Sequence, residues 1–195
     1  MIRTTMLIAA VVLLSTTVIA QETLISGEME SGGFGGPVVK LGTVNGESGI
    51  FVGGRGGWIV NHTFVLGGGG YGLVNRINAR RPSRNGFQYF QMGYGGLEVE
   101  YISEWEKLIH LSLQVLVGGG GVYYSGAENG MAHNQEQDAF FVLEPAVHAN
   151  LNVTSRFVVS LGMSYRYISG VTHPATSNAD LGGLNTVLTF RFGKF

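Results

Sequence analysis

The residues of this sequence that could do acid–base chemistry lie on alternate positions of short segments. Glu144 and His148 are four residues apart, which in an extended strand is about 13 Å. That is too far for a direct acid–base pair, although either side chain can meet a neighbouring strand. His110 and Ser112 are two residues apart, and His173 lies in a predicted loop. A nucleophile and its base must lie within about 3 Å, and no spacing here specifies a triad, so we predict no catalytic residue, no cofactor and no metal.

A larger set of ionisable residues shares the polar phase of segments in which apolar and polar residues alternate. They are Lys40, Arg55, Glu98, Glu100, His110, Glu144, His148, Arg166 and Arg191. A period of two places the apolar and polar residues on opposite faces of a strand. If the polar faces line a narrow closed interior, these charges must pair, because an unpaired buried ion costs several kcal/mol. We predict a paired polar network that plugs this interior; a pathway for water or protons through the same groups is an alternative.

The alternation defines eight candidate strands. The clearest runs from Arg156 to Ile168, where every second residue from Phe157 to Tyr167 is apolar or aromatic and the intervening residues are mostly small or polar. The strands are expected at Gly35–Val44, Ile50–Asn61, Thr63–Ile77, Gly86–Ile102, Leu108–Tyr124, Asp138–Val153, Arg156–Ile168 and Leu184–Phe195. The pattern predicts an all-β chain.

The connections between these strands alternate in length. Short ones are Asn61-His62, Ser103–Lys107 and Asn152–Ser155; the others are Asn45–Ser48, which is also short, and the longer Ala79–Asn85, Ser125–Gln137 and Ser169–Gly183. Short turns on one rim and longer loops on the other are typical of an outer-membrane barrel with periplasmic turns and extracellular loops. Aromatic residues are expected in two girdles, with Tyr101, Trp105, Phe157 and Phe192 near the periplasmic rim and Phe87, Tyr89, Tyr123, Tyr124, Tyr165 and Tyr167 near the outer rim.

The first twenty residues have the pattern of an export signal. Arg3 precedes an apolar run at Met6–Leu14, and small or β-branched residues lead to a cut after Ala20. The alternative is a retained anchor helix, but polar Ser15–Thr17 interrupts the run before the 17–25 apolar residues that a span needs. We therefore expect a signal peptide at 1–20, a periplasmic lead-in at 21–34 and an outer-membrane barrel at 35–195.

Composition narrows the classes of function. The chain has 12 basic and 13 acidic residues and no cysteine, which gives no electrostatic case for nucleic acid and no disulfide or thiolate site. Glycine is 32 of 195 residues while hydrophobic residues remain 45 %, which argues against disorder. After Ala20 no apolar run is long enough for a membrane helix, so a membrane protein of this sequence must be a closed barrel. A soluble secreted ligand-binding barrel is the alternative, but its outer face would carry dense charge.

With its last strand in view, the chain resembles the small eight-stranded bacterial outer-membrane β-barrel proteins. The resemblance covers residues 35–195 as architecture, together with the terminal Phe195 and the opening Gly32–Pro37. It implies an antiparallel up-and-down transmembrane barrel in the outer membrane, with Phe195 as the signal read by the barrel assembly machinery. The apolar set Leu188, Phe190 and Phe192 is one residue out of phase with Phe195, so Phe195 either folds back past the strand end or follows a bulge near Gly193.

The resemblance favours a non-enzymatic barrel whose long loops serve surface contact or envelope integrity. A lipid-modifying enzyme, which in such barrels uses a His with Ser or Glu at the membrane face, is the alternative from another class. Arg76, Arg80, Arg81 and Arg84 gather in and beside the second long loop. Guanidinium groups bind phosphates in bidentate fashion, so lipopolysaccharide is the expected partner of this loop, besides outer-membrane lipids; an ordinary solvated loop is the alternative. The sequence does not specify an oligomeric state.

Overall fold

The chain folds into one antiparallel sheet. The computed structural model describes residues 30–78, 88–126, 136–172 and 176–195. Its strands are β1 (Ser31–Val44), β2 (Glu47–Val60), β3 (Phe64–Leu73), β4 (Ile77–Asn78), β5 (Gln88–Ile102), β6 (Ile109–Gly126), β7 (Glu136–Thr154), β8 (Phe157–Ser169) and β9 (Gly183–Lys194), with one short helix, α2 (Asn178–Leu181). No helix among these residues is long and apolar enough to cross a membrane.

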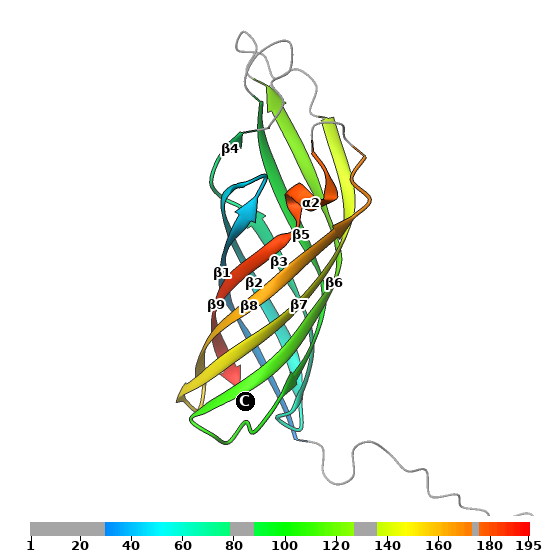
Figure 1. Cartoon of the computed structure of the whole chain (residues 1–195). Helices are drawn as coiled ribbons and strands as arrows, with labels where there is room; N and C mark the ends of the chain where they lie inside the picture. Colours follow the sequence, from blue (N-terminus) through cyan, green and yellow to red (C-terminus); the bar gives the residue numbers. More distant parts are fainter. Residues whose placement is uncertain (1–29, 79–87, 127–135, 173–175) are drawn as a thin grey trace, which may run out of the picture.

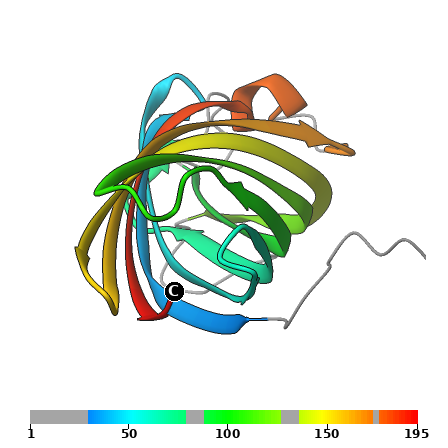
Figure 2. The same ribbon diagram turned by 90° about the horizontal axis from the view of Figure 1, so that it is seen from below.

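The sheet closes on itself as an eight-membered barrel. From β1 to β3 and from β4 to β9, strands adjacent in the chain are adjacent in the sheet. β9 pairs with β1 and β3 pairs with β5, which closes the ring (Figure 2). The two-residue β4 also pairs with β5, beyond the end of β3, so β3 and β4 share one place in the ring. Closure gives each edge strand a partner, which removes the unpaired edges of an open sheet.

The two ends of the barrel differ, as the connection lengths predict. The start of β1 and the end of β9 lie at the lower end in Figure 1, together with the turns that follow β2, β5 and β7. The opposite end carries α2, the end of β6 and the start of β7. At that end β1 and β2 are joined by Asn45-Gly46 with φ of 54° and 80°, the left-handed pair that a tight two-residue hairpin requires. We call the lower end the terminal end and the other the loop end.

The outer face of the wall is apolar, whereas the inner face also carries the polar and charged residues. On β5, Leu97 is 70 % exposed while its neighbour Glu98 is 1 % exposed. The same inversion holds on β8, where Leu161 and Met163 are exposed and Ser160 and Ser164 are buried. This arrangement is the reverse of a soluble barrel and suits hydrocarbon outside. It disfavours the soluble ligand-binding alternative.

Outward aromatic residues lie near both ends of the strands. At the terminal end, the rings of Phe157 and Phe192 stack at 4.8 Å between centroids, and Phe64 lies 5.4 Å from Tyr101. Near the loop end the exposed aromatic residues include Tyr123, Phe141, Tyr165 and Tyr167. Phe87 lies outside the described residues, as do the side chains of Tyr89 and Tyr124.

The structure corrects the predicted boundaries in three places. β1 begins at Ser31 rather than Gly35, because Gly32 and Gly33 pair with β2 but have no side chains to show alternation. The predicted strand Thr63–Ile77 is interrupted after Leu73. Here the Asn75 side chain forms hydrogen bonds with backbone groups of β2 that a continuous strand would otherwise pair with. The predicted loop Ser169–Gly183 contains α2, whose N-cap Ser177 forms a capping box with Asp180.

The interior is not polar throughout, which differs from the prediction. The larger apolar cluster lies toward the loop end and includes Phe51, Tyr94, Phe140 and Leu181 of α2. A smaller one at the terminal end contains Phe34, Ile59, Val65 and Ile102, with Phe195 packed against it. Where both phases of a strand are apolar, an alternation of period two does not tell which face points inward. In the predicted strand Thr63–Ile77, the apolar phase with Val65 and Tyr71 faces inward.

Candidate functional site

The nine ionisable residues of the predicted interior set all point into the barrel. None of Lys40, Arg55, Glu98, Glu100, His110, Glu144, His148, Arg166 and Arg191 is more than 7 % exposed. They come from seven strands on all sides of the ring. The structure divides them into two ion-paired groups, one arginine held by neutral oxygens, and two histidines.

The first group, here the guanidinium–carboxylate cluster, consists of Arg55, Arg191, Glu98 and Glu100. Arg55 donates from Nε to Glu98 (2.6 Å) and from Nη2 to Glu100 (2.9 Å). Arg191 donates from Nη2 to the other oxygen of Glu100 (2.6 Å). Glu98 also accepts a hydrogen bond from the Tyr71 hydroxyl. Glu100 therefore bridges guanidinium groups from β2 and β9, the two strands that flank β1.

Glycines of β3 make room for this cluster. β3 lies between β2, which carries Arg55, and β5, which carries both glutamates. Gly69 is paired with Arg55, and a Cβ on Gly69 would lie only 2.4 Å from Glu98 Oε1 and 2.5 Å from Tyr71 Oη. The bare backbone of β3 thus allows Arg55 to reach across it, so part of the glycine content serves the interior rather than the turns.

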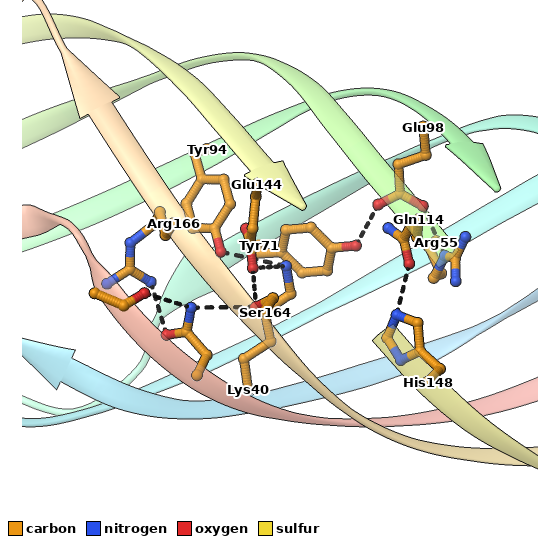
Figure 3. A network of polar contacts seen from close by, with 12 residues as sticks. Lys40, Arg55, Tyr71, Tyr94, Glu98, Gln114, Glu144, His148, Ser164 and Arg166 are labelled. Carbon is orange, nitrogen blue, oxygen red and sulfur yellow. Dashed lines mark hydrogen bonds and ion pairs between the residues drawn. The ribbon is translucent and has the colours of Figure 1, made fainter. Parts of the chain in front are cut away.

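The second group is centred on Lys40 (Figure 3). Its Nζ lies 2.9 Å from Glu144 Oε1 and donates to the Tyr94 hydroxyl at 3.3 Å. The ammonium also sits 3.5 Å from the centre of the Tyr71 ring, where the negative face of the ring attracts it. Glu144 accepts a further hydrogen bond from Ser164. We call these residues the lysine cluster.

Arg166 has a different environment from the other interior cations. Its Nε donates to the Leu181 carbonyl of α2 (2.8 Å), its Nη1 to Asn185 (3.2 Å) and its Nη2 to the Thr43 carbonyl (3.4 Å). Its guanidinium lies 4.5 Å from the Phe51 ring centre. Among the described residues no carboxylate is recorded as its ion-pair partner. This arginine joins α2 to the wall.

The two histidines contact neutral groups. His148 Nε2 lies 2.9 Å from the Gln114 side-chain oxygen. Gly162 stands beside this ring, and a Cβ there would lie 2.3 Å from His148 Nδ1. His110 Nδ1 lies 3.2 Å from the Lys107 carbonyl. Carbonyl oxygens only accept, so Nδ1 donates and Nε2 is the free side of the His110 ring.

The serines of the interior bond to other groups. Ser164 donates to Glu144, Ser160 donates to Asn150, and Ser112 accepts from Asn150. No serine–histidine hydrogen bond is recorded in the part of the chain that the structure describes, and no group of three or more potential metal ligands gathers there. His173 lies outside the described residues.

Several residues of these groups were not in the predicted set, namely Tyr71, Tyr94, Gln114, Ser164 and Asn185. Tyr94 shares its phase with Glu98 and Glu100 on one strand, and Gln114 shares its phase with His110, so their position was visible in the alternation. Tyr71 was assigned to an apolar phase because a pattern that sorts residues only into apolar and polar counts tyrosine as apolar for its ring. In the structure its hydroxyl donates to Glu98 on the neighbouring strand β5.

The terminal end carries an exposed acid–imidazole pair. His62 Nε2 lies 2.6 Å from Glu30 Oε2, and the imidazole stacks on Trp105 at 4.0 Å between ring centroids. The hydrogen bond from His62, with its charge, holds the pKa of the Glu30 carboxyl below its usual range. Glu30 directly precedes β1, so this pair fixes where the chain enters the barrel.

Phe195 lies one residue past β9. Pairing of β9 with β8 and β1 shows no register shift near Gly193, so the predicted alternative of a bulge is wrong. Phe195 keeps the inward phase of Arg191, and its ring stacks on Phe34 at 6.1 Å.

In the predicted arginine group, Arg76 is exposed, whereas Arg80, Arg81 and Arg84 lie outside the described residues.

Solved structures of the same architecture identify the fold. Neisserial surface protein A matches with a TM-score of 0.62 and 12 % identity, over 87 % of this chain and 100 % of that one. The N-terminal barrel domain of Pseudomonas aeruginosa OprF matches with a TM-score of 0.53 and 9 % identity, over 84 % and 96 %. The chain has the fold of the small outer-membrane β-barrel proteins.

A third match agrees. Ail, the attachment invasion locus protein of Yersinia pestis, solved with the heparin analogue sucrose octasulfate, has a TM-score of 0.51 and 14 % identity, over 87 % of this chain and 100 % of that one. No protein-family model matches the sequence, and no curated protein matches it. The likeness is therefore one of architecture.

Proposed function

We propose that this protein is a closed, non-enzymatic barrel of the bacterial outer membrane that does not conduct ions, and that its loop end faces outward for surface contact or envelope integrity. The observation that carries the proposal is the interior network. Lys40 and Glu144 join one side of the barrel to the other, as do Arg191 and Glu100. An eight-stranded barrel is just wide enough for side chains to fill it, so these pairs take the space that a pore would need.

Apolar contacts at both ends support the same proposal. Leu181 of α2 is fully buried in the apolar cluster of the loop end, and the Asn45 backbone N–H donates to the Asp180 carbonyl next to it. At the terminal end, Phe34 and Phe195 pack on Ile59 and Ile102. A hydrated ion would have to displace these side chains as well as the ion pairs.

Conductance tests the closed interior. Purified protein in planar lipid bilayers is expected to give no single-channel steps in molar salt, while a large trimeric porin added to the same bilayer serves as positive control. The double variant Glu144→Ser with Lys40→Ser removes one of the ion pairs that span the interior. It tests whether these ion pairs are what closes the barrel. Regular channel steps from the unmodified protein would overturn the proposal.

Location and orientation have their own test. The apolar belt and the outer-membrane fold support the outer membrane, and the pattern of residues 1–20 supports a cleaved signal with 21–34 as lead-in and 35–195 as barrel, although β1 already begins at Ser31. The protein is expected in the carbonate-resistant membrane fraction, with an unboiled band that shifts on heating and a mature N-terminus at Gln21. Release by carbonate without a heat shift would contradict this.

We further propose that the basic second loop, with Arg76, Arg80, Arg81 and Arg84, contacts lipopolysaccharide phosphates. The Ail structure with a heparin analogue supports the idea only as an instance of this fold with a polyanion. Replacing Arg80, Arg81 and Arg84 by Gln is expected to weaken binding of lipopolysaccharide micelles and to reduce its salt dependence. The control replaces Arg156, at the opposite end, by Gln.

Phe195 is proposed as the assembly signal for the barrel assembly machinery. The variant Phe195→Ser is expected to lower the amount of folded barrel in cells while refolding in detergent is preserved. If refolding in detergent fails equally, Phe195 acts through its packing on Phe34 instead.

A further inference from the structure

A pocket of about 400 Å³ opens at the terminal end of the barrel. Its inner wall is apolar and consists of Ile59, Ile102, Val158 and Phe195, while Trp105 lies at its side. The turn residues Thr154 and Ser155 form part of the exposed rim. Pockets that bind small molecules have volumes of about 300–1,000 Å³ and apolar walls with few polar groups, and this one has that character.

Two buried polar side chains face this apolar space. Arg191 is 1 % exposed and His110 is 7 % exposed, and both line the pocket. Arg191 uses Nη2 for Glu100, but its buried Nε has no hydrogen-bond partner among the described residues. His110 uses Nδ1 for the Lys107 carbonyl, which leaves Nε2 as its other polar atom. The lining of the pocket thus includes an imidazole and a guanidinium whose covered Nε has no partner among the described residues.

We propose that this pocket binds a single-chain amphiphile with a carboxylate head, a fatty-acid-like molecule. Its acyl chain would lie against Ile59, Ile102 and Phe195, and its carboxylate would be held near Arg191 and His110. A guanidinium favours a carboxylate over a neutral or cationic head. Among the described residues of the lining, Glu106 is the one carboxylate, and it lies on the exposed rim, where solvent screens it. Glu100, which Arg191 Nη2 contacts, is not part of the lining. This proposal is independent of the proposed function, because binding in the pocket does not require the barrel to be closed to ions.

Tryptophan quenching gives a local readout, because the chain has two tryptophans and only Trp105 lines the pocket. Trp58 is on the outer face, so the variant Trp58→Phe leaves Trp105 as the sole emitter. This protein in lipid nanodiscs would be titrated with decanoate brominated on its chain. We expect saturable quenching that unlabelled decanoate reverses. Quenching that rises linearly with the probe, as partition into the lipid would produce, would overturn the proposal.

A matched pair of substitutions tests the place of binding. In the Trp58→Phe background, Ser155→Phe fills the mouth of the pocket and is expected to weaken binding of the probe about tenfold or more. Ser48→Phe makes the same change on an exposed serine at the loop end and is expected to leave binding unchanged. Equal affinity in both variants, with each barrel shown folded by its heat shift, would place the ligand elsewhere and overturn the proposal.

The head group is tested without changing the protein. Brominated decanol and a brominated decyl trimethylammonium probe have similar chains but lack the carboxylate. Both are expected to bind at least about tenfold more weakly than the carboxylate, as loss of a charge-assisted hydrogen bond predicts. Equal binding of all three would show an apolar cavity without selectivity for carboxylates and would overturn this assignment.

Discussion

The barrel stabilises its interior cations in two different ways. In the guanidinium–carboxylate cluster, Arg55 and Arg191 share Glu98 and Glu100, so two positive charges meet two negative charges. Nearer the loop end, Arg166 bonds backbone carbonyls and Asn185 and faces the Phe51 ring. The first arrangement joins strands of the wall, and the second attaches a helix to it.

The difference has a physical consequence for what each arrangement can tolerate. A carboxylate removed from a buried cluster leaves a guanidinium that cannot lose its proton, and an uncompensated buried charge is strongly destabilising. A guanidinium held by carbonyl dipoles leaves only neutral groups behind when it is removed. We therefore expect substitutions in the cluster to act on the whole barrel and substitutions at Arg166 to act on α2.

The largest effect is expected from Glu100→Gln. This change removes the charge that both Arg55 and Arg191 contact, and breaking a buried pair costs about 3–5 kcal/mol. Urea unfolding in lipid vesicles, followed by tryptophan fluorescence, measures the loss. The control Glu106→Gln, on the exposed rim, should change the free energy of unfolding by no more than about 0.5 kcal/mol. Similar losses in both variants would contradict the role of the cluster.

A smaller loss is expected from Glu144→Gln, about 1–3 kcal/mol. Lys40 loses its ion-pair partner, but it keeps the Tyr94 hydroxyl and the Tyr71 ring, and an amine, unlike a guanidinium, can release its proton. The same unfolding assay compares the two variants directly. A loss as large as that of Glu100→Gln would show that the two groups are not different in kind.

Arg166→Met should mainly loosen α2. The methionine keeps apolar contact with Phe51 but loses the hydrogen bond to the Leu181 carbonyl. We expect a change of about 1 kcal/mol or less in global stability and at least tenfold faster amide exchange at Gly182, whose N–H bonds the Asn178 carbonyl. Unchanged exchange at this amide would show that the Leu181 side chain alone holds the helix.

The smallest effect on stability is expected from the exposed Glu30–His62 pair at the terminal end. This pair extends the comparison to charges that are in contact with water. Because the folded-state pKa of Glu30 lies below its usual value, the pair stabilises the fold above that usual value and loses this contribution as pH falls through the lowered pKa. Carboxyl NMR titration should give a lower midpoint for Glu30 in the unmodified protein than in His62→Gln. Equal midpoints would exclude the interaction.

Much of the fold was predictable because the barrel obeys a single period. Lipid outside and a narrow lumen inside require opposite chemistry on successive residues, so Leu97 and Glu98 could be assigned to opposite faces from their order alone. The start of β1 was not predictable, since glycine has no side chain to alternate. The helix α2 was missed as well, because four residues are too few for a helical period.

The partners within the candidate site were beyond the sequence. Glu100 and Arg191 are 91 positions apart, and no spacing in a list of charged residues selects this pair over Glu144 and Arg191. Gly69 shows the same limit. Its role became visible only when the register placed it beside Arg55 and close to Glu98.

By itself, the sequence determined that the chain is a barrel with an apolar outside and that the nine ionisable residues of its polar phase face inward. Alternation, loop lengths and the absence of a second long apolar run suffice for that, because each is a local property of the chain. Tertiary structure decided which charges pair, that α2 packs against the wall at the loop end, and that Phe195 folds in against Phe34 to leave a pocket beside Arg191. These contacts depend on how strands on opposite sides of the ring are staggered, and only closure of the barrel sets that stagger.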